Sequence, residues 1–172
     1  MSIIATDLDG TIFKGQTLID GVREGLLEII KEGIEIYYTT NNSSQTPSEI
    51  KSKLESLLQL NIDISKIITP LVIFQNLYSD NKLNIFIYGN DNLKKYIKNL
   101  NMNVTSLENA ELVLIGRKDE NNYSEINEII KNVSLGKNIL CLNKDLTFPT
   151  EFGEKAGNGA VVKIIEDELS IN

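Results

Sequence analysis

The chain has 172 residues, of which 41% are hydrophobic and 24% charged, as is typical of one globular domain or two small ones. Its net charge of −7, without any basic cluster, argues against a nucleic acid or an anionic membrane as the main partner. It has no histidine and one cysteine, Cys141, which excludes histidine-based catalysis, cysteine-rich zinc sites and an intramolecular disulfide. No apolar run is long enough to cross a membrane and no basic segment precedes the first apolar stretch, so we expect a cytoplasmic protein.

The first part of the chain alternates short apolar runs with amphipathic segments. Residues 2–6 are predicted to form a buried strand, and residues 34–39 a second strand. Between them, a helix is expected to begin after a cap at Asp20 and to end at Gly33. Its apolar side chains share one face, which is formed by Val22, Leu26, Ile29 and Ile30.

Two further helices are marked by their starting residues. Thr46 can cap a helix, Pro47 suits its first position, and Glu49 completes a capping box. The Thr-Pro pair at residues 69–70 repeats this signal and predicts a helix that ends near residue 78.

A polar break at residues 79–82 separates a second alternating block, so we place a domain boundary between residues 1–80 and 81–172. Strands are predicted at residues 84–88, 111–115 and 138–142. Helices are predicted at residues 91–100, 123–133 and about 159–168. This strand–helix alternation predicts an α/β fold with parallel sheets. Cys141 falls inside an apolar strand, where a buried thiol is expected rather than a reactive one.

Two aspartates follow the first predicted strand directly, in Asp7-Leu8-Asp9-Gly10-Thr11. Open α/β sheets place ligand sites at the carboxyl ends of their strands, and alternate residues of a strand share a face. Asp7 and Asp9 can therefore approach one point, where a bound cation would relieve their repulsion. Oxygen ligands of this kind favour Mg²⁺. Gly10 allows the backbone to turn sharply after the pair.

The second predicted strand ends in a polar run at residues 39–44, Thr-Thr-Asn-Asn-Ser-Ser. Hydroxyl and amide groups there can hold phosphoryl oxygens, and the neighbouring strand would bring them beside the aspartates. Each segment also has a plainer interpretation, as a turn and as a loop before a capped helix. An EF-hand calcium loop does not fit, because its sixth position would be Ile12 instead of glycine. Both segments close a strand with one helix between them, and together they indicate magnesium-dependent phosphoryl transfer.

Residues 3–11, Ile-Ile-Ala-Thr-Asp-Leu-Asp-Gly-Thr, resemble the first motif of the haloacid dehalogenase superfamily. Residues 40–43, Thr-Asn-Asn-Ser, resemble its second motif in the NagD-like and nitrophenylphosphatase-like branch, subfamily IIA. Gly15 and Asp20-Gly21 match the flap and the following helix start of that branch. Three further parts of the chain resemble the cap domain of that branch. They are the strands at 85–89 and 112–116, Asn143-Lys144-Asp145 with Pro149, and Gly157-Asn158-Gly159-Ala160. The resemblance covers nearly the whole chain and implies a Rossmann-like core with an α/β cap domain.

The resemblance also implies an activity, that of a phosphatase acting on a small phosphorylated metabolite such as a sugar phosphate. Asp7 would attack phosphorus and form an aspartyl-phosphate. Asp9 would protonate the leaving oxygen and later activate water. Mg²⁺ would be held by the carboxylate of Asp7 and the backbone carbonyl of Asp9. The substrate-binding residues would be Gly10, Thr11, Thr40 and Asn41.

Two motifs of that family are absent from the sequence, the lysine of Gly-Lys-Pro and the carboxylate cluster that completes the magnesium shell. Lys137 follows a glycine but precedes a predicted cap strand, and we interpret it as a solvated loop residue. The core is therefore expected to be partial, lacking its C-terminal strands, with an unpaired edge at residues 3–6. We expect a truncated form, half of a split enzyme, or an edge covered by self-association or by a complementing chain.

Alternatives to an active phosphatase stay open. The chain can be a catalytically impaired remnant, or one half of a split enzyme that acts as a binding or structural subunit. A phosphate-accepting receiver domain fits less well, because the acidic pair of that fold is adjacent whereas Leu8 separates the two aspartates here. A phosphomutase or another phosphotransferase of the same family would share the motifs.

Overall fold

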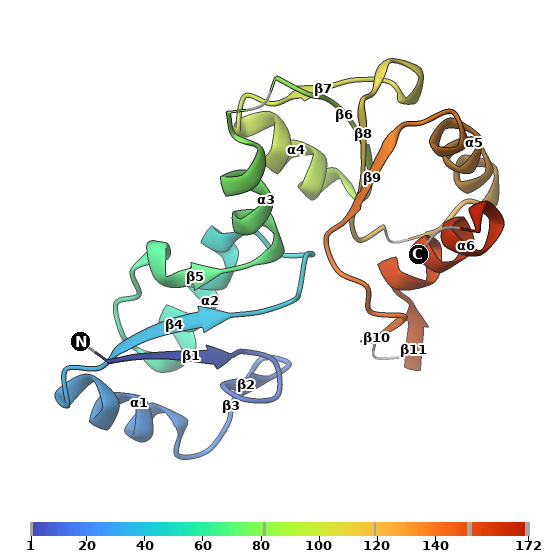
Figure 1. The fold of residues 1–172 in the computed structure, drawn as a ribbon. Coiled ribbons are helices and arrows are strands. Elements are labelled where there is room, and N and C mark those ends of the chain that lie inside the picture. The colour runs from blue at the N-terminus through green and yellow to red at the C-terminus, as the bar shows by residue number, and fades with distance from the viewer. Residues whose placement is uncertain (1, 81, 119, 151–152, 171–172) are drawn as a thin grey trace. The chain divides into compact units, whose positions relative to one another are not determined.

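The computed structural model of the chain describes residues 2–80, 82–118, 120–150 and 153–170 (Figure 1). The chain divides into two units, Met1–Ile73 and Phe74–Asn172. The boundary falls inside helix α3 (Pro70–Tyr78), so this helix contributes residues to both units. In the part of the chain that is described, no helix is both long and apolar enough to cross a membrane.

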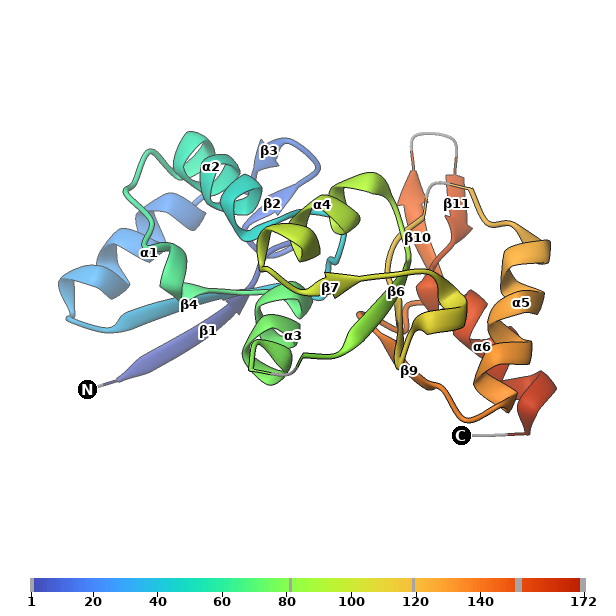
Figure 2. The same ribbon diagram turned by 90° about the horizontal axis from the view of Figure 1, so that it is seen from above.

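The first unit is built on a three-stranded parallel sheet in the order β1-β4-β5. Its strands are β1 (Ile3–Asp7), β4 (Glu35–Thr39) and β5 (Ile67–Ile68). Its other elements are the hairpin β2 (Phe13–Lys14) and β3 (Thr17–Leu18), the helices α1 (Val22–Lys31) and α2 (Pro47–Leu58), and the 3-10 helix η1 (Ile64–Lys66). Figure 2 shows α1 and α2 together on one side of the sheet.

The core of the first unit forms where α1 and α2 cover this sheet. Its buried apolar side chains are Leu8, Ile12, Phe13, Leu26, Ile36, Tyr38, Ile50, Leu54, Leu58, Ile62 and Ile67. The two helices are also joined at 2.8 Å by a hydrogen bond from Arg23 Nε to the carbonyl oxygen of Leu58. Strand β1 lies at the edge of the sheet, and its Ile3 side chain is 57% exposed. The edge strand thus presents apolar surface that this unit leaves uncovered.

The second unit contains a four-stranded parallel sheet in the order β7-β6-β8-β9. Its strands are β6 (Asn84–Tyr88), β7 (Asn103–Val104), β8 (Leu112–Ile115) and β9 (Asn138–Cys141), and β10 (Thr147–Thr150) and β11 (Gly153–Ala156) form a hairpin. Its helices are α4 (Asp91–Asn99), η2 (Leu107–Asn109), α5 (Tyr123–Ser134) and α6 (Asn158–Leu169). Figure 2 shows α5 and α6 on one side of this sheet and α4 on the other. The core beneath α5 and α6 consists of Tyr88, Val113, Ile115, Ile126, Ile129, Val161, Val162 and Ile165.

The predicted alternation of strands and helices is confirmed in both units. The capping box also forms as predicted: the Thr46 hydroxyl accepts the backbone N–H of Glu49 at 3.3 Å, and the Glu49 carboxylate accepts that of Thr46 at 2.7 Å. Thr69 also caps α3, with a single bond, because its hydroxyl accepts the backbone N–H of Val72 at 3.2 Å. Helix α1 ends at Lys31, just before Gly33, which has a positive φ of 71°.

Three expectations for the first unit are wrong. The cap of α1 is Gly21 in the left-handed conformation instead of Asp20, since a glycine with φ 77° makes the turn into the helix without a side-chain bond. Ile30 is exposed, because it lies at the margin of the apolar face and in the last turn of the helix. Residues 3–5 of β1 are exposed rather than buried, because β1 lies at the sheet edge and lacks a neighbour on one side, which agrees with the unpaired edge expected at residues 3–6.

Several short elements were not predicted from the sequence. They are β2, β3, β5, β7, the β10–β11 hairpin and the two 3-10 helices. Runs of two to four residues are too short to show a period. Lys137 also differs from the expected solvated residue. It is half-buried, and its ammonium donates to the carbonyl oxygens of Glu108 at 2.7 Å and Ala110 at 2.8 Å.

Candidate active site

The aspartate pair lies at the carboxyl end of β1. Leu8 is only 1% exposed and enters the core, whereas the residues on either side of it, Asp7 and Asp9, are exposed. Alternation along an extended backbone produces this pattern, because successive side chains point to opposite faces. Asp7 and Asp9 thus flank an apolar anchor at the end of the strand, with both acidic residues exposed.

A tight turn follows the pair and is held by backbone hydrogen bonds. The carbonyl oxygen of Leu8 accepts the N–H groups of Thr11, Ile12 and Phe13 at 3.2, 2.9 and 3.2 Å. The N–H of Gly10 donates to the carbonyl oxygen of Phe13 at 2.8 Å, and Gly10 adopts a φ of 85°. That conformation suits glycine, which explains why the residue after the pair has no side chain.

Strand β4 brings the second polar run to the same end of the sheet, where the carboxyl ends of β1 and β4 lie. In the parallel register Asp7 pairs with Thr39, and the Thr39 hydroxyl donates to the carbonyl oxygen of Thr6 at 3.0 Å. Thr40, the next residue, is 9% exposed, and its backbone N–H donates to the carbonyl oxygen of Ile68 at 3.1 Å. Thr40 is thus fixed between two strand ends, one residue beyond the level of Asp7.

The loop after β4 is ordered by its own side chains. The Thr40 hydroxyl accepts the backbone N–H of Asn42 at 3.0 Å. The Asn42 side-chain oxygen accepts the backbone N–H of Ser44 at 2.9 Å and the Ser44 hydroxyl at 2.6 Å. Asn41 is exposed and Ser43 is buried in this loop. The Thr40 hydroxyl keeps a proton to donate, so it can also bond an anion.

The donor set of the strand end fits a hard divalent cation. The side-chain carboxylates of Asp7 and Asp9 and the main-chain carbonyl of Asp9 are oxygen ligands of the type that Mg²⁺ takes, and Mg²⁺ commonly keeps several waters in such sites. Among the described residues, no group of three or more histidine, cysteine, aspartate or glutamate side chains gathers that could hold a metal ion. A cation bound here would therefore rely on few protein ligands.

One charged residue near the pair was missed by the sequence analysis. The ammonium of Lys53, on α2, lies 3.5 Å from the centroid of the Phe13 ring. Burial lowers the pKa of Lys53, and the charge of Asp9 opposes that shift. The contact joins residues 40 positions apart across two elements, so no local pattern in the sequence could reveal it.

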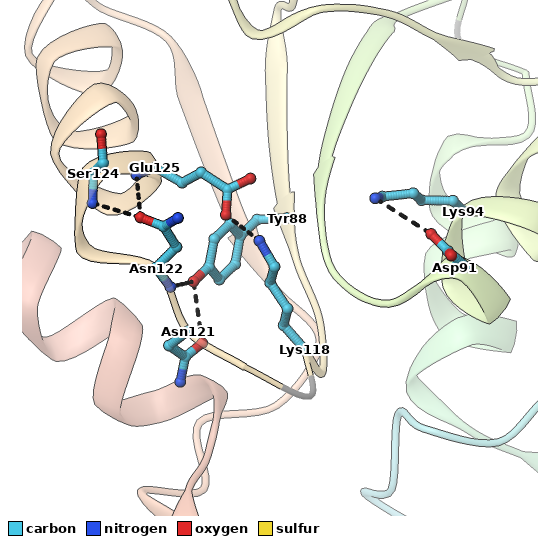
Figure 3. Close-up of polar contacts among 8 residues, drawn as sticks. All are labelled: Tyr88, Asp91, Lys94, Lys118, Asn121, Asn122, Ser124 and Glu125. Carbon is cyan, nitrogen blue, oxygen red and sulfur yellow. Dashed lines mark hydrogen bonds and ion pairs between the residues drawn. The ribbon is translucent and has the colours of Figure 1, made fainter.

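The second unit carries a polar cluster at the carboxyl end of its own sheet (Figure 3). The hydroxyl of Tyr88 donates to the side-chain oxygen of Asn121 at 3.1 Å and accepts the backbone N–H of Asn122 at 3.4 Å. The ammonium of Lys118 lies 4.5 Å from the Tyr88 ring centroid and pairs with the Glu125 carboxylate. Burial raises the pKa of Tyr88. The cluster fastens the start of α5 to the end of β6.

The two glycines at the start of α6 are explained by close backbone contact. A Cβ at Gly159 would lie 2.1 Å from the carbonyl oxygen of Lys144, and one at Gly157 would lie 2.3 Å from that of Asp145. The N–H of Gly159 instead donates to the Asp145 carbonyl oxygen at 3.0 Å. The Gly-x-Gly pattern thus lets the helix start pack directly on the loop after β9.

The geometry and the motifs together define the class of protein. Residues 4–103 match the family of haloacid dehalogenase-like hydrolases, which is more than half of the chain. The chain therefore belongs to the haloacid dehalogenase-like hydrolase family.

Individual proteins confirm the branch that the motifs predicted. The acid sugar phosphatase of Staphylococcus haemolyticus (strain JCSC1435) is 30% identical over 163 residues, which are 92% of this chain and 61% of that protein. The p-nitrophenyl phosphatase from Archaeoglobus fulgidus has the same fold, with a TM-score of 0.88 at 20% identity over 98% of this chain and 65% of that one. A glycerol phosphate phosphatase from Mycobacterium tuberculosis, in complex with magnesium, gives a TM-score of 0.82 at 22% identity over 99% of this chain and 52% of that one. The predicted fold class, a Rossmann-like core with an α/β cap, is confirmed, and the chain spans less than two thirds of these relatives' lengths.

Proposed function

We propose that this chain carries the catalytic aspartates of a magnesium-dependent phosphatase for a small phosphorylated metabolite, such as a sugar phosphate. The observation that carries the proposal is that Asp7 and Asp9 are both exposed around the buried Leu8 at the end of β1, while Asp7 pairs in register with Thr39, the residue before Thr40. The names of the relatives, acid sugar phosphatase and p-nitrophenyl phosphatase, support the reaction class.

In the proposed first step a carboxylate oxygen of Asp7 attacks phosphorus, and the bond from phosphorus to the leaving oxygen breaks. Asp9, as a carboxylic acid, gives its proton to that oxygen, so the alcohol departs neutral. In the second step the Asp9 carboxylate takes a proton from water, which attacks phosphorus and breaks its bond to Asp7. Phosphate leaves, and both aspartates return to their starting states.

The same residues would hold the cofactor and the phosphoryl group. Mg²⁺ would be bound by the Asp7 carboxylate and the Asp9 backbone carbonyl, and when bound it neutralises charge on the phosphoryl oxygens. The groups that hold the phosphoryl oxygens in place would be the backbone turn and the polar loop, at Gly10, Thr11, Thr40 and Asn41.

We place the core domain of this phosphatase in residues 1–80 and the cap domain in residues 81–172. The cap would choose the substrate and exclude water from the reacting groups. The working compartment we propose is the cytoplasm, with neither a nucleic acid nor a membrane as partner.

A second candidate function is that of a binding or structural subunit, either a catalytically impaired remnant or one half of a split enzyme. One observation favours it: β1 lies at the edge of its sheet, and its Ile3 side chain is 57% exposed. The exposed edge of β1 would then take a second copy or a complementing chain, because unpaired strand edges favour association.

The two candidates differ in whether phosphate becomes bonded to Asp7. We would incubate the protein with Mg²⁺ and glycerol phosphate, quench in acid, and locate added phosphate by peptide mass spectrometry. The phosphatase predicts phosphate on the peptide that contains Asp7, lost in Asp7→Asn and kept in Asp20→Asn, whose side chain lies at the start of α1. Phosphate on no peptide, at any quench time and with a panel of sugar phosphates, would favour the binding subunit.

A further inference from the structure

Lys53 lies on the side of α2 that adjoins the core. Ile50, Leu54 and Leu58 form the buried stripe of this helix, and Lys53 is half-buried beside it. A lysine in such a place buries its methylene stem and directs its ammonium outward. Here the ammonium stops over the Phe13 ring, at 3.5 Å from the centroid, a distance at which a cation is attracted by the ring face.

Phe13 belongs to the turn that carries Asp9. Asp9 and Phe13 form an isolated bridge, the Phe13 carbonyl oxygen accepts the N–H of Gly10 at 2.8 Å, and the Phe13 side chain is 1% exposed. The ring is therefore fixed against the backbone of the aspartate pair. A charge seated on that ring is fixed there as well.

The electrostatics agree with this placement. Burial lowers the pKa of Lys53, while the Asp9 carboxylate acts in the opposite direction and favours the charged ammonium. Lys51, two residues earlier on the same helix, pairs instead with Glu55 at 3.4 Å. The charge of Asp9 thus reaches the Lys53 ammonium, which lies over the Phe13 ring.

We propose that Lys53 is a positioning residue of the Asp7–Asp9 site, whose ammonium, held on the Phe13 ring, adds positive charge beside the two carboxylates. The inference rests on the proposed function, because it assigns Lys53 to the same phosphoryl site. A positive charge there repels Mg²⁺ and attracts phosphate, so its removal must change the two affinities in opposite directions. A purely structural lysine would change both in the same direction or neither.

The test measures two binding constants by calorimetry, Mg²⁺ alone and inorganic phosphate in the presence of Mg²⁺. The variants are Lys53→Met, which keeps the apolar stem, Lys53→Arg, which keeps the charge and the ring contact, and Lys51→Met as the matched control. For Lys53→Met we expect Mg²⁺ to bind roughly threefold to tenfold more tightly and phosphate to bind more weakly by a similar factor. Lys53→Arg should restore both constants, and Lys51→Met should leave both unchanged.

Each other outcome has a distinct meaning. If the wild type binds Mg²⁺ and phosphate, but Lys53→Met equals Lys51→Met or weakens both ligands together, the inference is wrong and the proposed function stands. If the wild type binds neither ligand, the proposed function fails and the inference falls with it. Thermal unfolding of each variant confirms that the binding constants compare folded proteins.

Discussion

Asp7 and Thr39 are register partners at the carboxyl end of the parallel pair β1–β4, and the hydroxyl of Thr39 donates to the carbonyl oxygen of Thr6 at 3.0 Å. This pairing brings together two segments that are 32 residues apart in the sequence, at the carboxyl ends of their strands. It places Thr40 next to the aspartate pair, and the predictions for the site depend on that placement.

Thr40→Val should weaken phosphate binding and destabilise the loop after β4. The valine keeps the shape of threonine but leaves the Asn42 N–H without the oxygen that accepts it at 3.0 Å, which costs about 1–2 kcal/mol of unfolding free energy. Thr39→Val is the matched control, since its hydroxyl bonds a strand carbonyl instead of the loop. Calorimetry with Mg²⁺ and phosphate, beside urea unfolding, measures both effects. Equal phosphate affinity in the two variants would contradict the role assigned to Thr40.

Gly10→Ala should destabilise the protein by about 1 kcal/mol, because an alanine is strained at a φ of 85° even though its Cβ would meet no atom within 4 Å. Gly25→Ala offers the opposite case. This glycine lies inside α1, where an added Cβ also meets nothing, so alanine should stabilise the helix by roughly 0.5–1 kcal/mol. Urea unfolding of both variants checks the signs. Two changes of the same sign would show that backbone conformation does not decide the cost at Gly10.

Cys141 should react slowly with thiol reagents. Burial raises the pKa of its thiol to about 11, and its Sγ donates to the carbonyl oxygen of Asn143 at 2.6 Å. Because the thiolate is the reactive form, alkylation at pH 8 should be at least tenfold slower than that of a small free thiol. Labelling followed by mass spectrometry gives the rate directly, since the chain has one cysteine.

The same raised pKa has a consequence for stability. Because folding disfavours the thiolate, the protonated thiol of Cys141 contributes to the unfolding free energy. This contribution is fully present below the ordinary thiol pKa, roughly 8.5, and is lost as pH rises toward about 11. Cys141→Ser should remove this alkaline decline in unfolding free energy. A decline of the same size in the serine variant would assign it to other groups.

The exposed edge of β1 should promote association. Ile3→Lys places a charge on the edge strand and should lower the apparent mass at high protein concentration, as measured by light scattering. Ile64→Lys is the control, because Ile64 is a similarly exposed apolar residue, 45% against 57%, that lies outside the sheet. A wild type that remains monomeric at every concentration would contradict self-association at this edge.

Much of the fold could be predicted from the sequence, because the spacing of residues within single helices and strands determines those elements. The helical spacing of Ile50, Leu54 and Leu58 predicted the buried face of α2, and Thr46 with Glu49 marked its first turn. The Asp7-Leu8-Asp9 alternation predicted that the two carboxylates share a face and can approach one point, and the residue between them, Leu8, is buried in the core. In each case one element alone determines the outcome.

The features that were missed depend on contacts between elements. The apolar run at residues 2–6 indicated a buried strand, whereas the observed edge position of β1 and the exposed Ile3 agree with the unpaired edge that the family resemblance implied. The contact of Lys53 with Phe13 requires α2 to pack against the turn after β1. At the start of α1, Asp20 and Gly21 are both residues that can precede a helix. The structure has Gly21, in the left-handed conformation, as the cap, and not Asp20.

The most direct test of the account is the hydrolysis of an aryl phosphate by the purified chain, with and without Mg²⁺, beside Asp7→Asn and the control Asp20→Asn. If the aspartate pair works as proposed, the wild type and Asp20→Asn turn over only with Mg²⁺, and Asp7→Asn loses activity by at least a factor of about 10³. Turnover that Asp7→Asn retains would contradict the account, as would a folded wild type that binds Mg²⁺ but never turns over.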